Sequence, residues 1–430
     1  MKLKLFVERG QALILIALAA IGLFGVTGLA IDGSAKFSDR RHAQNAADAA
    51  ALAGALALGN DKTDWKLNAL NIAFDNGYTD DLVSNNVEVY RCDEVDASCG
   101  TGYAGSIQYV QVIITSNVNT YFARVIGINQ THNTVQAVAL ARKAGPLFPG
   151  SSIVSLDPHS GCPGSLTVGG NGTVTLNGGG MFVNSDSSDC AFEQQGCSLD
   201  LQINGGGISS VGDGNVDFDA CYSGTTDTTT YNADPIQFPY DLDMPAEPTE
   251  CTSPAGWFSS DATTTYLHPG RYNEFPPKSG GGVHVRDNVF MYPGIYCVNN
   301  VVKLNDQHLI LNGTDVTIYI RPGYDFSIEN GEFHLSASTS GEYQGYLIIV
   351  ATDFSGSPTD CKINGNANDS YTGTIFAPYC NLTINGTANS TAYNGQIVGY
   401  DVKLNGSSNM SFTYNPDNNA KTKRKVGLMR

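Results

Sequence analysis

The chain has few charged residues, and few cationic ones in particular. Asp, Glu, Lys and Arg make up only 15% of its 430 residues, and 24 cationic against 41 acidic side chains give a formal net charge of −17. Nucleic-acid binding requires clustered Lys and Arg, so this balance argues against a nucleic-acid partner. The last ten residues differ, because they carry five cationic side chains. We expect residues 417–430 to form a solvated basic tail.

Familiar catalytic and metal-binding motifs are also missing. The sequence has no Gly-x-Ser-x-Gly, no His-Glu-x-x-His and no Walker loop, and its seven His are scattered. Arg is sparse after residue 142, and no acidic pair recurs at a spacing that would bring two carboxylates together. We therefore predict a protein that is not an enzyme and has no cofactor. A polysaccharide-active β-helix enzyme is the less favoured alternative.

One acidic run has the composition of a calcium site. Residues 213–219 place four oxygen-bearing side chains at alternate positions, which calcium could use as ligands. The run lacks the Gly and the distal Glu of an EF-hand loop, so an exposed acidic strand edge is the favoured reading. The calcium candidates are Asp213, Asn215, Asp217 and Asp219.

Ten cysteines, none in the paired C-x-x-C spacing of a zinc site, indicate an exported protein with disulfides. Two pairs are seven residues apart and suit short loops, and a third pair flanks one strand-turn-strand unit. The predicted bridges are Cys92 to Cys99, Cys190 to Cys197 and Cys361 to Cys380. The sequence does not assign partners to Cys162, Cys221, Cys251 and Cys297.

The first sixty residues predict a membrane anchor. A basic leader, residues 1–10, precedes an uncharged stretch, residues 11–31, which is long enough to cross a bilayer as a helix. Because Lys and Arg stay on the cytoplasmic side, we expect the rest of the chain outside. The alternative is a secretory signal cleaved near Gly28-Leu29-Ala30. Residues 32–60 are Ala-rich and extend the helix.

Small residues along this helix suggest that it packs closely against other helices. Gly and Ala side chains let a neighbouring backbone approach, both in the membrane and beyond it. The alternative is that the Ala-rich part packs on its own domain. The predicted packing positions are Gly22, Gly25, Gly28, Ala46, Ala50 and Ala53.

Three sequence features together resemble a known family. They are Arg9-Gly10-Gln11-Ala12-Leu13, the segment from Gly28 to Gly33, and Arg40-Arg41 followed by the Gln44–Ala55 run QNAADAAALAGA. The first sixty residues resemble the TadE/TadG-like proteins of Flp (tight adherence) pilus assembly. A cut after Gly10 would place Leu15 where pilin-type leaders have Glu. We therefore expect the leader to be retained.

The resemblance implies a single-pass protein of the bacterial cell envelope. Its partners would be the membrane and other pilin-like or Tad pilus proteins, and an extracellular filament is a further location. The implied role is structural, in pilus assembly or surface attachment. The alternative is a surface adhesin or glycan-binding module, because 21 Tyr offer stacking surfaces for a glycan or host ligand.

The remainder divides into a small head and a repetitive region. Residues 61–143 read as a helix, strands, a short helix and a strand, which resembles a pilin-like α/β head, and residues 144–152 read as a linker. Residues 153–416 carry Asn-Gly corners, at spacings of 21 and 20 in Lys362–Gly365, Thr383–Gly386 and Lys403–Gly406. Earlier variants end at Gly178, Gly205 and Gly313, and Pro-Gly turns occur at Pro269, Pro293 and Pro322.

A fixed period near 20 residues with short strands predicts a β-solenoid. The predicted fold class is therefore α+β with an all-β majority: a transmembrane and amphipathic helix, a small α/β head and a C-terminal solenoid resembling a right-handed β-helix. A β-sandwich with Asn-Gly hairpins is the alternative.

Overall fold

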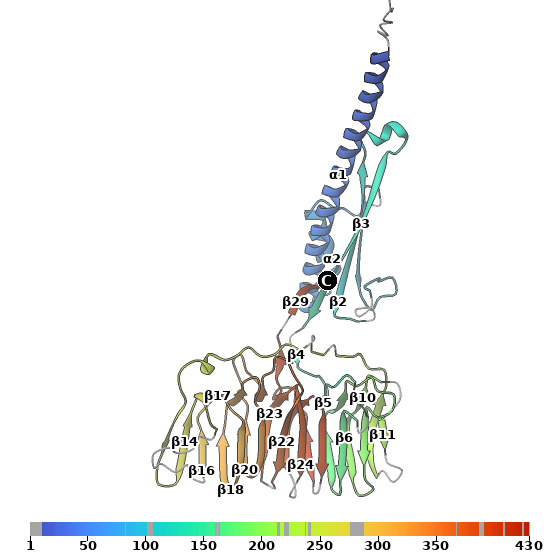
Figure 1. Ribbon diagram of the computed structural model, residues 1–430. Coiled ribbons are helices and arrows are strands. Elements are labelled where there is room, and N and C mark those ends of the chain that lie inside the picture. Colours follow the sequence, from blue (N-terminus) through green and yellow to red (C-terminus); the bar gives the residue numbers. More distant parts are fainter. Residues whose placement is uncertain are drawn as a thin grey trace, which may run out of the picture. The chain divides into compact units, whose positions relative to one another are not determined.

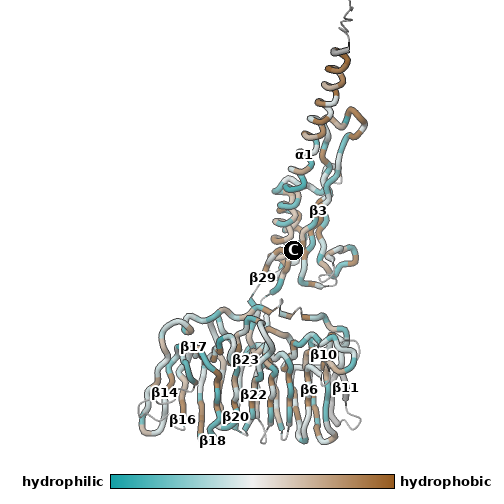
Figure 2. Tube along the Cα trace, viewed as in Figure 1, coloured by the Kyte–Doolittle hydropathy of each residue, from teal (hydrophilic) through white to brown (hydrophobic). Residues whose placement is uncertain are grey.

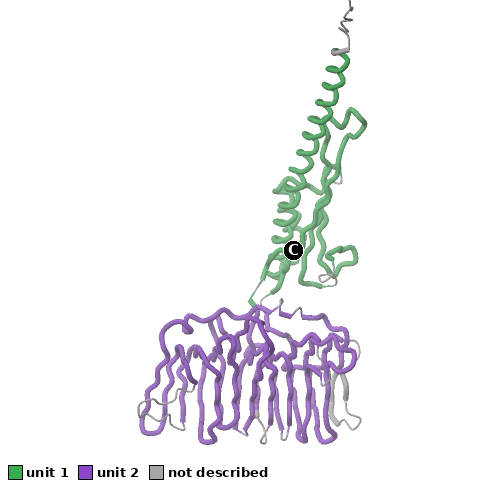
Figure 3. Tube along the Cα trace, in the orientation of Figure 1, with its two compact units in different colours: residues 1–144, 423–430 green, residues 145–422 purple. Residues whose placement is uncertain are grey.

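The computed structural model divides into two compact units, residues 1–144 with 423–430, and residues 145–422 (Figure 3). The second unit is inserted into the sequence of the first, so the chain passes between them twice. The described residues are 11–81, 83–100, 106–143, 145–159, 161, 164–212, 216–218, 223–236, 238–239, 242–275, 288–366, 368–386, 391–406, 409–423 and 425–429.

The first unit is a long helix with a small head built along its second half (Figure 1). Its four-stranded sheet has the order β1-β2-β3-β29, with every neighbouring pair antiparallel. Helices α1 and α2 pack on the sheet, and the 3-10 helix η1 connects β2 to β3. The bounds are α1 Gln11–Gly59, α2 Trp65–Asp75, β1 Asn85–Arg91, β2 Tyr109–Asn119, η1 Ala123–Ile126, β3 Gln130–Arg142 and β29 Lys425–Met429.

The C-terminal segment is a strand of the head sheet. Residues of β29 pair with β3 from Lys425 opposite Arg142 to Met429 opposite Val138. Just before it, β28 (Lys421–Thr422) pairs with β4 (Gly145–Pro146) in the second unit. The prediction of a solvated basic tail over residues 417–430 is therefore wrong. The cationic residues of this segment hid its apolar residues Val426, Leu428 and Met429, which belong to the edge strand of the sheet.

The second unit is a solenoid of parallel strands that form three ladders (Figure 1). Ladder 1 consists of β14 (Thr264–His268), β16 (Asn288–Met291), the second part of β18 (Val302–Gly313) and of β20 (Phe326–Ser336), the first part of β23 (Ser370–Ala377) and of β25 (Thr391–Gly399), β27 (Met410–Thr413), β7 (Thr173–Asn177), and the first part of β10 (Asp200–Ser210) and of β12 (Ser223–Thr230).

Ladder 2 consists of β15 (Gly270–Tyr272), β17 (Gly294–Val298), β19 (Val316–Ile320), β21 (Tyr346–Val350), the second parts of β23 and β25, β5 (Ser151–Ser155), β8 (Gly180–Val183) and the second parts of β10 and β12. Ladder 3 consists of the first parts of β18 and β20, β22 (Thr359–Gly365), β24 (Cys380–Gly386), β26 (Val402–Gly406), β6 (Leu166–Gly170), β9 (Phe192–Gln195) and β11 (Val216–Phe218).

The chain visits ladders 1, 2 and 3 in rotation and makes about nine turns. Apolar side chains of all three ladders share one core inside the coil. An antiparallel strand, β13 (Trp257–Ser260), pairs with β14 beyond the end of ladder 1. The predicted β-solenoid is confirmed. The β-sandwich alternative is wrong, because the Asn-Gly corners join parallel ladders and not antiparallel hairpins.

The turns do not stack in sequence order. Strands β5, β6 and β7, which come first in the solenoid sequence, pair with β25, β26 and β27, which come last. Strand β27 occupies ladder 1 and β5 occupies ladder 2, so together they supply two sides of one turn. The chain therefore joins and leaves the solenoid at an internal turn.

The three evenly spaced Asn-Gly repeats stack directly on one another in ladder 3. Asn364, Asn385 and Asn405 are in register. Asn385 Nδ2 donates to Asn364 Oδ1 at 2.7 Å, and Asn405 Nδ2 donates to Asn385 Oδ1 at 2.9 Å. Such a row pairs the side-chain amides of successive turns with one another, while the backbone of each strand forms hydrogen bonds to the strands above and below it. The repeat period therefore corresponds to one turn, as predicted.

The other repeats occupy different corners. The variants that end at Gly178, Gly205 and Gly313 lie in ladder 1. Pro269-Gly270 and Pro293-Gly294 both lead into ladder 2, whereas Pro322-Gly323 follows ladder 2 and precedes ladder 3. Asn-Gly and Pro-Gly dipeptides therefore occur at more than one kind of corner, so they mark a corner without identifying which one it is.

The segment 231–256 returns the chain from one end of the solenoid to the other, where β13 begins (Figure 1). Its apolar residues, including Ile236, Phe238 and Met244, pack on the outer side of ladder 2. A disulfide joins Cys251, in the 3-10 helix η2 (Thr249–Cys251), to Cys297 of β17. Ladder 2 strands such as β19 and β21 are therefore buried on both sides, which explains their uninterrupted apolar sequences.

Disulfides join described residues at three places. Cys92 bonds Cys99 in the head, and Cys361 bonds Cys380 between β22 and β24; these are two of the predicted pairs. The third bridge, between Cys251 and Cys297, was not assigned from the sequence. Cys190 and Cys197 are both disulfide-bonded, but the predicted bridge between them is not among those three. Cys162 and Cys221 lie outside the described residues.

Candidate functional site

The first half of α1 is the most exposed apolar surface among the described residues (Figure 2). It belongs to the one described helix that is long and apolar enough to cross a membrane, with a mean hydropathy of 2.5 over its best window. The large side chains that it exposes are Leu13, Ile14, Leu15, Ile16, Leu18, Ile21, Leu23, Phe24, Val26, Leu29 and Ile31. Such a surface requires an apolar environment.

The second half of α1 is covered by its own head. Its small residues recur at helical spacing, and the stripe faces α2 and the sheet. Gly54 shows how close the packing is, because a Cβ there would lie 3.1 Å from Ala69 Cβ and 3.2 Å from Val110 Cγ1. The fully buried alanines are Ala43, Ala46, Ala47, Ala50, Ala51 and Ala55.

The predicted helix-packing positions therefore separate into two groups. Ala46 and Ala50 are fully buried in the head and Ala53 is partly buried, so the prediction that Ala46 and Ala50 face another protein's helix is wrong. The motif supplies a flat surface on which the chain's own sheet docks. Gly22 and Gly25 have no atom within 4 Å of a Cβ position, so they remain open to a neighbour. Gly28 is covered by Phe122, 2.7 Å from its Cβ position.

Two aspartates attach α1 to the head. The Asp32 carboxylate accepts hydrogen bonds from the backbone N–H groups of Tyr121, Phe122 and Ala123, at 2.7–3.3 Å. These donors, that of Tyr121 foremost, lower the pKa of Asp32. About two helical turns further along α1, the Asp39 carboxylate accepts hydrogen bonds from Asn133 Nδ2 at 2.7 Å and from Ser116 Oγ at 2.5 Å. Neither aspartate was predicted to have a role, although Asp32 lies in a segment that carried the resemblance.

These features define a protein with a long N-terminal helix, apolar enough in its first half to cross a membrane, whose small-residue face is covered by its own sheet. Comparison with known families identifies the helix: residues 10–57 match the family model described as Putative Flp pilus-assembly TadE/G-like. The predicted TadE/TadG-like segment is therefore confirmed, and it coincides with α1. A pilus-assembly-associated protein, anchored in the membrane of the cell envelope, fits both the match and the helix.

No curated protein matches the chain, and no solved structure matches it. The family match ends at residue 57, before the solenoid begins.

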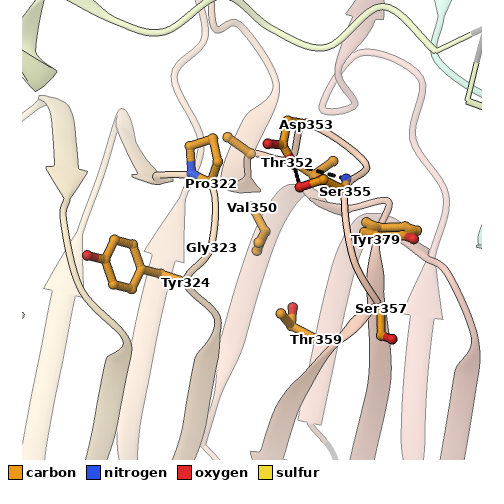
Figure 4. Close-up of a pocket in the computed structure, with 11 residues that line it drawn as sticks. Pro322, Gly323, Tyr324, Val350, Thr352, Asp353, Ser355, Ser357, Thr359 and Tyr379 are labelled. Carbon is orange, nitrogen blue, oxygen red and sulfur yellow. Dashed lines mark hydrogen bonds between the residues drawn. The ribbon is translucent and has the colours of Figure 1, made fainter.

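One pocket lies at the corners between ladders 2 and 3 (Figure 4). Its volume is about 180 Å³, below the ~300 Å³ at which pockets usually hold a small molecule. Its polar groups are used locally: the Asp353 carboxylate accepts from the N–H and hydroxyl of Ser355, and the Tyr379 hydroxyl donates to the Gly356 carbonyl oxygen at 2.8 Å. The size of the pocket and the local use of these polar groups therefore favour a structural role at the corner over ligand binding.

A larger groove of about 590 Å³ lies beside ladder 1. Its polar lining consists mainly of amide side chains, such as Asn288, Gln307 and Asn368, with the carboxylate of Glu332 and the ring of His308. Glu332 accepts from Asn368 Nδ2 at 3.2 Å and lies 2.7 Å from His334 Nε2. These two contacts, that with His334 foremost, lower the pKa of Glu332, so the carboxylate is charged at neutral pH.

Next to this groove, aromatic rings face outward from β13, from the ladder 1 strands β14 and β16, and from Tyr292 just after β16. We call this cluster the aromatic face. Trp257 stacks on His268 with ring centres 3.5 Å apart, and the ring centres of His268 and Tyr292 are 4.6 Å apart. Trp257 is 55% exposed and Tyr292 is 39% exposed. The remaining members of the aromatic face are Tyr266 and Phe290.

The predicted calcium site lies mostly outside the described residues. Asp213, Asn215 and Asp219 are not described, and Asp217 belongs to β11. Within the described part of the chain, no group of three or more His, Cys, Asp or Glu could hold a metal ion.

Two carboxyl groups of the solenoid are poorly solvated. Burial raises the pKa of Asp369 to about 6, although the N–H groups of Asn366 and Phe333 oppose the shift. Burial, with the charge of nearby Asp157, raises the pKa of Asp401 to about 7. Both groups bind protons in the folded state at a pH where an unfolded chain has released them.

We expect the solenoid to lose stability as the pH rises from about 4 to about 7. In this range the folded state holds more protons than the unfolded state, so the free energy of unfolding falls with pH. Asp401→Asn should reduce this loss, and should raise the free energy of unfolding at pH 8 by about 1–3 kcal/mol relative to wild type. Urea denaturation of the detergent-solubilised wild type and variant at pH 5 and pH 8 measures the loss of stability with pH and the gain at pH 8.

The matched control is Asp353→Asn, an exposed carboxyl whose pKa is lowered by the hydroxyl and N–H of Ser355. That variant should not gain stability at pH 8. Equal pH dependence in wild type and Asp401→Asn would show that Asp401 is not the group responsible.

Proposed function

We propose that this protein is a TadG-like, non-catalytic component of a Tad pilus system. In this role α1 holds the protein in the membrane, with its leader inside, and the head and solenoid are presented outside the cell. The observation that carries the proposal is the coincidence of the TadE/G-like match, residues 10–57, with a helix whose first half is exposed and apolar.

The geometry limits where other pilus proteins can contact α1. Because the head covers the alanine stripe, the surface open to a partner helix is the first half of α1. Gly22 and Gly25 provide the closest approach there, since nothing lies near their Cβ positions. We propose that partner helices pack at these two glycines within the membrane.

Deletion of the gene should remove surface pili, and the Gly22→Ile/Gly25→Ile variant should fail to restore them. We expect at least a tenfold lower pilus count by electron microscopy, because the added side chains separate the two helices. The matched control, Ile21→Leu/Leu23→Ile, changes exposed positions of the same turns while keeping side-chain size and should restore pili. Normal piliation of the deletion strain would contradict the proposed role.

The aromatic face supports a second candidate function, attachment to carbohydrate. The C–H groups of a sugar ring pack on the electron-rich faces of Trp and Tyr, and its hydroxyls bond to amide and carboxylate groups. The aromatic face and the groove with Asn288 and Glu332 offer both kinds of contact side by side.

The same strains distinguish the two candidates. A Trp257→Ala/Tyr292→Ala variant that keeps its pili but loses attachment to a polysaccharide-coated surface would favour the adhesin. Unchanged attachment in a piliated strain would remove that candidate.

A further inference from the structure

The tip of the β2–β3 hairpin, residues 120–129, exposes apolar side chains although it belongs to the head. Val125 is 88% exposed, Ile126 76% and Tyr121 73%, and Phe122 and Ile128 are also exposed. The tip appears in Figure 1 as the teal loop beside α1. A soluble domain rarely places several large apolar side chains together in water.

The position of the tip relative to α1 follows from direct contacts. Phe122 lies against Gly28, and the backbone of residues 121–123 is bonded to Asp32. Gly28 is four residues before Asp32, about 6 Å along the helix, and belongs to the apolar span. The apolar side chains of the tip are therefore beside the last turns of that span.

The backbone of the tip is hydrogen-bonded within the protein, as a lipid environment requires. Asp32 accepts from three consecutive N–H groups, which include Phe122. The N–H groups of Val125, Gly127 and Ile128 donate to carbonyl oxygens inside the tip at 3.0–3.1 Å. The irregular segment can thus leave water without leaving these donors unpaired.

The polar residues of the tip suit an interface. Arg124 is exposed, and it forms no ion pair with a described residue. A long cationic side chain can extend to lipid phosphates while the neighbouring apolar groups are buried. Tyr121 combines a ring and a hydroxyl, which favours the headgroup region.

We propose that residues 121–128 form a second membrane contact, which inserts into the leaflet at the Asp32 end of the α1 span. The lipid surface is favoured over a second copy of the chain because the tip continues the apolar surface of the anchor, at the level where that surface ends. The inference rests on the proposed function in one respect, namely that residues 11–31 span a bilayer. The contact would set the tilt and depth of α1.

Tryptophan quenching by brominated lipids tests the proposal with the full chain in liposomes. The chain has two Trp, both outside the span, so their signal can be subtracted. Val125→Trp should be quenched at least twofold by phosphatidylcholine brominated at carbons 6 and 7. Val95→Trp is the matched control, because Val95 is 100% exposed in the same unit but distant in sequence from the tip. It should remain unquenched.

A third variant separates the two proposals. Leu23→Trp lies in the span and should be quenched; if it is not, the membrane anchor itself fails. Quenching of Leu23→Trp with no more quenching of Val125→Trp than of Val95→Trp would overturn the tip contact. A blue-shifted Val125→Trp emission that is unquenched and depends on protein concentration would also overturn it, in favour of a second copy of the chain. Ile126→Trp repeats the test at a neighbouring exposed position.

Discussion

Replacing Gly395 by alanine should destabilise the solenoid by about 3 kcal/mol or more. Gly395 is stacked on Gly373 in the next turn, and a Cβ on Gly395 would lie 2.1 Å from the Gly373 carbonyl oxygen. Backbone atoms cannot rotate away as a side chain would, so the two turns must separate and their strand pairing must weaken. Urea denaturation monitored by circular dichroism measures the loss.

Gly145→Ala is the matched control for this substitution. Gly145 belongs to the same unit, has no positive φ, and has no atom within 4 Å of its Cβ position. Its replacement should change the free energy of unfolding by less than about 0.5 kcal/mol. If Gly395→Ala were equally mild, the close stacking of Gly373 and Gly395 would be wrong.

Truncation after Thr422 should destabilise the head by about 3–5 kcal/mol, although it removes only eight residues. The deletion removes β29, which pairs with β3 over five residue positions, and it leaves the edge of β3 unpaired. It also removes Met429 from its contacts with the cluster that contains Val138 and the Cys92–Cys99 bridge. Hydrogen exchange of the amides of residues 138–142 should become faster by at least tenfold.

Removal of Arg430 alone is the control, because it leaves all of β29 in place. That variant should exchange like wild type. A free basic tail would instead predict that both truncations behave like the full chain, so this outcome would contradict the placement of β29.

The parts of the fold that the sequence predicted are those with a local signal. The anchor follows from the length and composition of residues 11–31, and the solenoid follows from the spacing of Asn364, Asn385 and Asn405. In each case the residues that reveal the element in the sequence also stabilise it: apolar side chains form the surface of the helix, and stacked Asn amides connect the turns.

Features that depend on distant contacts were not predicted. The QNAADAAALAGA run indicates a flat helix face, but the same alanines suit a partner protein and the chain's own sheet equally well. The stacking of β5 on β25 leaves no signal either, since every turn presents similar apolar side chains to its neighbours. The role of Asp32 depends on a hairpin tip about ninety residues away in sequence.

The internal attachment of the solenoid affects how it resists force. A solenoid that is connected through its terminal turn can unfold from that end, one turn at a time, because a terminal turn is paired on one side only. Here the two connections leave from neighbouring strands, β5 and β27, which have paired strands on either side in their ladders. A force applied through these two connections would enter strands that are paired on both sides. The turns at both ends of the solenoid, including those with the aromatic face, lie away from these two connections along the ladders.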